Sequence, residues 1–175
     1  QKYDGVFALW YGKGPGVDRS GDALKHGSYS GSSKNGGVLV LAGDDHGAKS
    51  STIAHQSDHA FIHFGMPYLN PSSVQDYLDF GLYGFALSRY SGCWVGMKCV
   101  TDTIESSASV SVDLDSFELS LPTDYELPAG GLNAATGLTP PKLAEVRQFE
   151  QRLPAVRAFV RANGLDKVIL GPQKR

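Results

Sequence analysis

The feature that most constrains the fold is the alternation of short apolar runs with helical stripes along the first hundred residues. Apolar runs of strand length occur at 6–10, 38–42, 67–69 and 93–100. Helical patterns lie between them, at about 17–29, 51–64 and 72–89. Uninterrupted apolar runs are typical of strands covered on both faces. With short connections, this order predicts an α/β fold, a doubly wound and mainly parallel sheet flanked by helices.

Residues 101–141 break this pattern. They are rich in Ser, Thr, Asp, Pro and Gly, and brief alternation at 110–114 and 117–121 predicts an irregular excursion with one small hairpin. A helical stripe resumes at Pro141, which Pro154 should kink or restart. Gly164 is the expected residue just after the helix, and 168–170 is an expected last strand.

Three segments follow from these patterns. Residues 1–100 form the α/β core, 101–141 the excursion, and 142–175 a helical segment whose terminal strand leads to a next domain. Asp18 and Ser20 are candidate caps of the first helix. Ser73, with Asp76 three residues later, forms a weak capping-box pattern before the third helix.

Charge and cysteine content exclude several classes of protein. The formal net charge of −2 gives no general attraction to nucleic acid or to an anionic membrane. No apolar run approaches the roughly 20 residues that span a bilayer, and no secretory signal is visible, so we expect a cytoplasmic protein. Cys93 and Cys99 lack the spacing of a zinc or iron–sulfur motif and are expected to be small buried residues.

The first candidate binding loop follows the first strand. In an open parallel sheet, ligands bind beyond the carboxyl ends of the strands, and Gly12, Lys13 and Gly14 begin the loop Gly-Lys-Gly-Pro-Gly there. The pattern is neither a Walker A loop nor a dinucleotide-binding fingerprint. The alternative is a tight loop that needs glycine dihedral angles.

The second candidate loop follows the strand at 38–42. It contains the polar residues Asp44, Asp45, His46, Ser50 and Ser51. Burying such groups unpaired costs several kcal/mol. They are therefore solvated, paired with one another or facing a ligand, and ordinary helix capping is the competing explanation.

Two other groups of residues are candidates for a metal site and for a catalytic triad, and the sequence supports neither. His55, His59 and His63 lie at i, i+4 and i+8 of a predicted helix, but a third ligand about 12 Å along the axis cannot reach the same ion, so we expect no metal site. A Ser–His–Asp triad can be assembled on paper from Ser50 or Ser51, His46 and Asp45. No G-x-S-x-G elbow supports it.

Longer runs of sequence resemble the fused indolepyruvate:ferredoxin oxidoreductases of the 2-oxoacid:ferredoxin oxidoreductase family. The similar runs are 5–22, 36–46, 50–52, 55–57, 69–75, 88–94 and 103–108. The similarity covers about the first two thirds of the chain and continues more loosely to Gly164. The matching segment of that family is part of its thiamine-diphosphate pyrimidine (PYR) domain.

The resemblance implies a specific partnership. A PYR domain pairs with a pyrophosphate-binding (PP) domain that holds thiamine diphosphate and Mg²⁺. The whole enzyme decarboxylates a 2-oxoacid, which the resemblance implies to be indolepyruvate or another arylpyruvate. It passes the electrons through 4Fe-4S clusters to ferredoxin and forms an acyl-CoA. The family's catalytic glutamate and first strand lie upstream of the segment matching Gly5, so no catalytic residue is assigned. We expect this chain alone to be inactive and to bind no cofactor.

The resemblance also suggests roles for the two loops. Residues 12–16 and 44–51 correspond to strand ends that face the aminopyrimidine and the 2-oxoacid. Lys13 and His46 are the expected contacts, while Asp44, Ser50 and Ser51 are as well suited to fixing the loop. Asp45 is placed to hold the His46 tautomer.

Two alternatives remain open at this point. One is a non-catalytic interaction domain that retains the PYR fold. The other is an unrelated doubly wound ligand-binding domain. Without the first strand and helix of the PYR domain, an exposed apolar sheet edge would favour a homo-oligomer.

Overall fold

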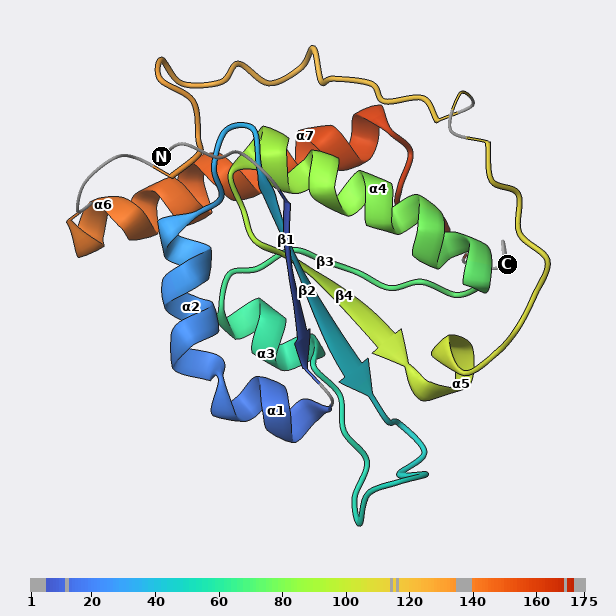
Figure 1. The fold of residues 1–175 in the computed structure, drawn as a ribbon. Helices are drawn as coiled ribbons and strands as arrows, with labels where there is room; N and C mark the ends of the chain where they lie inside the picture. The colour runs from blue at the N-terminus through green and yellow to red at the C-terminus, as the bar shows by residue number, and fades with distance from the viewer. Residues whose placement is uncertain are drawn as a thin grey trace.

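The fold is built on a parallel β-sheet (Figure 1). The computed structural model describes residues 13–113, 115, 117–134, 140–168 and 170–171, and the backbone of 6–11. The strands are β1 (Val6–Tyr11), β2 (Gly37–Asp44), β3 (Tyr68–Leu69) and β4 (Val95–Val100). They lie in the order β1-β2-β4-β3 and all pair in parallel. The predicted α/β class and parallel sheet are confirmed.

Helices cover both faces of this sheet (Figure 1). On one face lie α1 (Gly14–Arg19), α2 (Gly21–Ser30) and α3 (Asp58–His63), and on the other α4 (Val74–Ser91) and α7 (Leu153–Ala162). β2 supplies both cores because side chains alternate along a strand. Val38 and Val40 pack with Phe61 of α3, and Leu39 packs in the core of α4 and α7.

α4 shows how local sequence sets helix boundaries. Ser73 is its N-cap, and the Ser73 hydroxyl accepts a hydrogen bond from the Asp76 N–H at 3.1 Å. At the other end Gly92 adopts φ +74°, the left-handed conformation that favours glycine. The expected capping box is only half formed, because the Asp76 carboxylate accepts from the N–H and hydroxyl of Ser72.

Two predicted helices on the first face differ from expectation. The helix expected at 17–29 is divided at Ser20 into α1 and α2; Asp18 lies within α1, and Ser20 makes no side-chain cap. The helix expected at 51–64 begins only at Asp58. Residues 51–57 are a loop instead, in which His55 forms an antiparallel bridge with Asp45.

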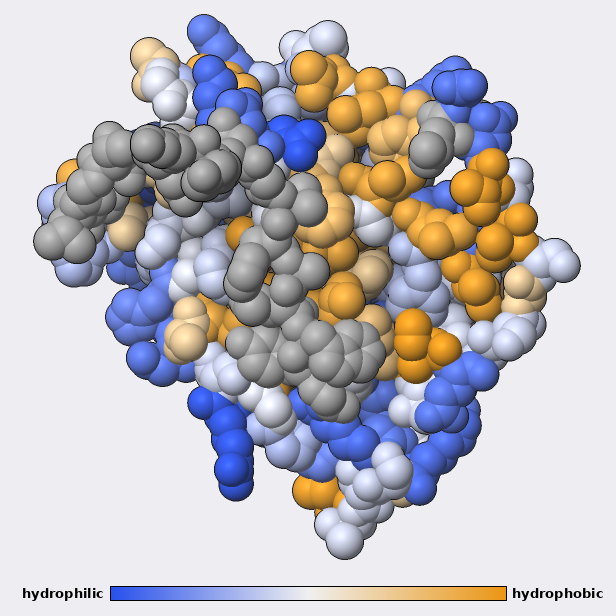
Figure 2. Space-filling model, viewed as in Figure 1, coloured by the Kyte–Doolittle hydropathy of each residue, from blue (hydrophilic) through white to orange (hydrophobic). Residues whose placement is uncertain are grey.

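The excursion begins with the short helix α5 (Thr101–Ile104). The hairpin expected at 110–121 is not found, since the described residues of that segment contain no strand. The chain instead passes beside α4, where Gln75 exchanges hydrogen bonds with the backbone of Ser111. Exposed apolar side chains gather on this side of the molecule (Figure 2); they include Leu78, Leu82, Val112 and Leu121.

The C-terminal helical segment is continuous but changes its pitch. α6 (Pro141–Val146) leads into the π-helical η2 (Arg147–Arg152) and then into α7. Pro154 stands in the first turn of α7. Because proline has no N–H and its ring clashes with a carbonyl one turn earlier, the wider π-helical turn accommodates it. The sequence predicted a kink or a restart at Pro154; the structure shows a change of helical pitch without a break.

The end of α7 is partly as expected. Gly164 adopts φ +58°, and the N–H groups of Gly164 and Leu165 donate to the carbonyls of Arg161 and Val160, which is a Schellman motif. The strand expected at 168–170 is not seen in its described residues, because Val168 and Leu170 are exposed and extend no sheet. None of the helices in the described part of the chain combines the length and apolarity that crossing a bilayer requires.

Arg152 anchors the C-terminal helices to the amino end of the sheet. Its side chain is fully buried and donates to the last three carbonyls of α2, residues 28–30, and to the carbonyl of Leu132. These carbonyls carry the negative end of the α2 dipole. Gly31 (φ +89°) is required here, since a Cβ atom would lie 2.2 Å from an Arg152 nitrogen. One guanidinium therefore joins three segments of the chain.

Replacing this guanidinium should destabilise the fold. Lysine has fewer donors and no planar fork, so Arg152→Lys leaves buried carbonyls unpaired and should lower the free energy of unfolding by about 3 kcal/mol. Urea denaturation monitored by circular dichroism measures the change. Arg157, exposed in α7, gives the matched control Arg157→Lys. Equal midpoints for the two variants would contradict this role.

Candidate functional site

The two polar loops predicted as a site lie next to each other. β1 and β2 are parallel neighbours with Tyr11 opposite Ala42, so the segments that follow them leave from the same edge of the sheet. Lys13 joins them. Its ammonium donates to the Asp45 carboxylate at 2.9 Å, to the Ser51 hydroxyl at 2.7 Å and to the Ser50 hydroxyl. We call these four residues the Lys13 cluster.

Gly14 of the first loop allows this loop to lie close to the segment after β2. Gly14 is buried, and a Cβ atom there would lie 2.9 Å from the Cβ atom of His55. A larger residue would push the loop away from the segment after β2. Gly12, the other predicted glycine, lies outside the described residues.

Asp45 is the electrostatic centre of the Lys13 cluster. Its side chain is 1% exposed, and it accepts hydrogen bonds from the backbone N–H groups of Lys49 and Ser50. The hydrogen bond from Lys13, followed by that from Ser50, holds the pKa of Asp45 well below its ordinary value. Lys13 and Asp45 therefore form a hydrogen-bonded ion pair between the two loops.

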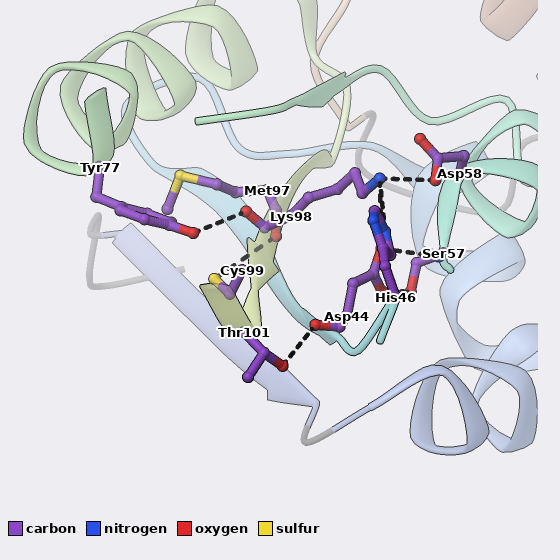
Figure 3. A network of polar contacts seen from close by, with 9 residues as sticks. All are labelled: Asp44, His46, Ser57, Asp58, Tyr77, Met97, Lys98, Cys99 and Thr101. Carbon is purple, nitrogen blue, oxygen red and sulfur yellow. Dashed lines mark hydrogen bonds and ion pairs between the residues drawn. The ribbon is translucent and has the colours of Figure 1, made fainter. Parts of the chain in front are cut away.

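A second cluster surrounds Lys98 on β4 (Figure 3). The Lys98 ammonium lies 2.7 Å from Asp58 Oδ2, 3.5 Å from Asp44 Oδ2 and 3.5 Å from His46 Nε2. Lys98 is 3% exposed and Asp44 is fully buried. We call Asp44, His46, Asp58 and Lys98 the Lys98 cluster. Burial raises the pKa of Asp58, but the hydrogen bond and charge of Lys98 outweigh it, and the net pKa lies below the ordinary value.

Asp44 is held in place by neighbours on two sides. Ser57 donates from its backbone N–H at 3.0 Å and from its hydroxyl at 2.6 Å, one bond to each carboxylate oxygen. The Thr101 hydroxyl donates to the Asp44 carbonyl at 3.0 Å. Ser57 stands immediately before α3 and Thr101 immediately after β4. Ser57 thus fixes the carboxylate of Asp44, and Thr101 fixes its backbone.

The predicted partners of His46 are corrected by this geometry. Asp45 faces Lys13, so it does not hold the His46 tautomer. The nearer carboxylate is Asp44, with Oδ2 3.7 Å from His46 Nε2. The hypothetical Ser–His–Asp triad is not formed either, because the hydroxyls of Ser50 and Ser51 bind Lys13 instead.

The three histidines of the predicted 51–64 helix do not share one face. His55 lies in the loop beside Asp45. Only His59 and His63 belong to α3, where they line a surface hollow together with Asp18 and Asp22.

Sequence reasoning missed Ser57, Asp58 and Lys98. One signal was present, because Lys98 is the only charged residue in the apolar run 93–100, and a lysine in a buried strand needs a compensating partner. Cys93 and Cys99 are buried as expected. Burial raises the pKa of Cys99 to about 11, so it is a thiol at neutral pH.

The low pKa of Asp45 predicts acid sensitivity. A carboxyl whose pKa is depressed in the folded state contributes stability above its unfolded pKa, near 3.8, and loses it as the pH falls. Asp45→Asn should lower the melting temperature at pH 7 and flatten its decline below about pH 5. Thermal unfolding followed from pH 7 to pH 2 tests both effects. Asp102→Asn, in an exposed pair with Lys49, is the control; an equal slope in both variants would refute the assignment.

Comparison with known proteins does not identify the chain. No protein-family model matches it. Searches of curated proteins and of solved structures also gave no match. The family resemblance therefore rests on the sequence runs alone, and the function is argued from the two clusters.

Proposed function

We propose that this chain forms one wall of the cofactor and substrate cleft of a thiamine-diphosphate-dependent 2-oxoacid:ferredoxin oxidoreductase. The substrate is an arylpyruvate such as indolepyruvate, the product an acyl-CoA, and the compartment the cytoplasm. The observation that carries the proposal is the contact of Lys13 with Asp45, Ser50 and Ser51. It joins the two motifs most similar to the family at the edge of a parallel sheet where ligands bind.

The Lys13 cluster is suited to binding a hydrogen-bond acceptor. The three N–H donors of the ammonium are directed to Asp45, Ser50 and Ser51. Each serine oxygen accepts from Lys13, which leaves its own O–H to donate. Two hydroxyl donors backed by one ammonium favour an acceptor group such as the carboxylate or the keto oxygen of a 2-oxoacid.

The charges at this edge of the sheet favour binding of the diphosphate by another domain. Lys13 is neutralised by Asp45, Lys49 is paired with Asp102, and Lys98 faces two carboxylates. These pairings leave little positive charge for a diphosphate. We therefore assign the diphosphate and Mg²⁺ to the PP domain, and the 4Fe-4S clusters and ferredoxin contact to other parts of the enzyme. Bound thiamine diphosphate supplies the carbanion chemistry, and residues of this chain orient the reactants.

His46 is the second proposed contact. Its side chain is 38% exposed, whereas its Nε2 atom faces the buried Lys98 ammonium (Figure 3). The ring is thus anchored on one side and open on the other, as a substrate-side group requires. The Lys98 cluster fixes the orientation of the ring.

The proposal is tested on the complete gene product, purified without oxygen. Arylpyruvate- and CoA-dependent reduction of methyl viologen is the measurement. Lys13→Met should lower kcat/KM by about 100-fold, because the two serine hydroxyls lose the group that positions them. Lys34→Met is the control, since Lys34 is exposed in the turn before β2, at the opposite end of that strand.

Two results would contradict the proposal. The first is a wild-type protein with no arylpyruvate-dependent reduction, which would favour an interaction domain or an unrelated ligand-binding domain. The second is an active enzyme in which Lys13→Met and Lys34→Met behave alike. That outcome would keep the family but remove the Lys13 cluster from the cleft.

A further inference from the structure

The Lys98 cluster has the geometry of a cation site. One oxygen of Asp44, one oxygen of Asp58 and one ring nitrogen of His46 all lie within 4.8 Å of one another. The Lys98 ammonium is 2.7–3.5 Å from each of the three. The three ligand atoms therefore surround a common position, and the lysine nitrogen occupies it (Figure 3).

The donor set matches a divalent metal of the first transition row. Two carboxylates and one imidazole are common zinc ligands, which bind at about 2.0–2.2 Å. Measured from the lysine nitrogen, the Asp58 oxygen would move inward by roughly 0.6 Å, and the Asp44 oxygen and the His46 nitrogen by roughly 1.4 Å each. Asp58 begins a short helix and His46 stands on a loop, so both can make this adjustment more readily than a residue within the sheet.

Asp44 already has the support that metal ligands usually have. Its carboxylate accepts from both the N–H and the hydroxyl of Ser57. Hydrogen bonds of this kind orient a ligand and are a regular part of metal centres. The partial exposure of His46 and Asp58, at 38% and 26%, gives an ion a route from solvent.

The charges decide which cation is present. Two carboxylates and one ammonium leave one negative charge uncompensated when His46 is neutral. Lys98 is covalently tethered to β4, so its effective concentration is high and a free ion competes poorly. Without the ammonium, the same carboxylates balance a divalent ion.

We infer that Asp44, His46 and Asp58 form a cation cage that Lys98 fills from within the chain. Removal of the ammonium converts the cage into a site for Zn²⁺ or Co²⁺. In the wild-type chain Lys98 takes the place of a structural metal and joins β2, β4 and α3 as such an ion would. This inference is independent of the proposed enzymatic function.

The test is a metal titration of Lys98→Met, which keeps the side-chain volume and removes the charge. Co²⁺ is the probe, because its visible absorption reports coordination by nitrogen and oxygen. The variant should bind Co²⁺ at least about tenfold more tightly than the wild-type 175-residue chain. Its melting temperature should rise with Co²⁺ concentration, and that of the wild type should rise much less.

Matched variants identify the ligands. Adding His46→Ala or Asp58→Asn to Lys98→Met should abolish the gain in Co²⁺ affinity. Adding His59→Ala and His63→Ala should leave it intact, which separates the cage from the exposed histidine pair on α3. A gain that survives loss of His46 and Asp58, or that disappears with His59 and His63, would overturn the inference.

Folding of the variant is part of the test. Lys98→Met leaves two carboxylates without their cation, and the chain could fail to fold in the absence of metal. Refolding from urea with and without Co²⁺ then becomes the readout, and recovery only with Co²⁺ supports the cage. Failure of Co²⁺ either to restore folding or to bind a folded variant more tightly than wild type refutes it.

Discussion

Two adjacent buried carboxylates at the end of β2 govern the architecture of the carboxyl edge of the sheet. Asp44 and Asp45 are each almost inaccessible to solvent. An isolated carboxylate in such a place costs several kcal/mol, so each needs its own cation. Neighbouring positions of a strand point in different directions, and the two cations come from different segments. Lys98 of β4 meets Asp44, and Lys13 after β1 meets Asp45.

The same carboxylates explain where helix prediction failed. The stretch at 51–64 has helical periodicity, yet its first half is a loop. Asp44 accepts from the N–H of Ser57, and the backbone of Asp45 pairs with that of His55. Just before this stretch, Asp45 also accepts from the N–H groups of Lys49 and Ser50. Charged acceptors offer N–H groups stronger partners than helical carbonyls do. The strands and α4 were predictable because apolar runs and the Ser73 cap are local. The hairpin and the terminal strand, which the described residues of 110–121 and 168–170 do not form, depended on pairing partners that local sequence does not reveal.

The candidate site likewise has one part that could be predicted from the sequence and one that could not. The contact between Lys13 and the Asp45–Ser51 segment was predictable, because parallel neighbours send their following loops to one edge. The Lys98 cluster was not, because it needs the register of β4 against β2, in which Lys98 stands opposite Ala42. That register brings the lysine beside Asp44, two residues further along the same face. Asp58 joins only because the loop delays the start of α3.

The two ends of the molecule use their buried cations differently, and the side chains suit the task. Arg152 lies among carbonyl oxygens at the end of α2, where a planar fork with five donors meets several separate acceptors. Lys98 lies among three atoms that converge on one point, where a compact ammonium fits and a guanidinium would not. A point charge is also what a metal ion provides. The amino end of the sheet is therefore fixed by hydrogen-bond geometry, and the carboxyl end, where ligands bind in such sheets, by charge.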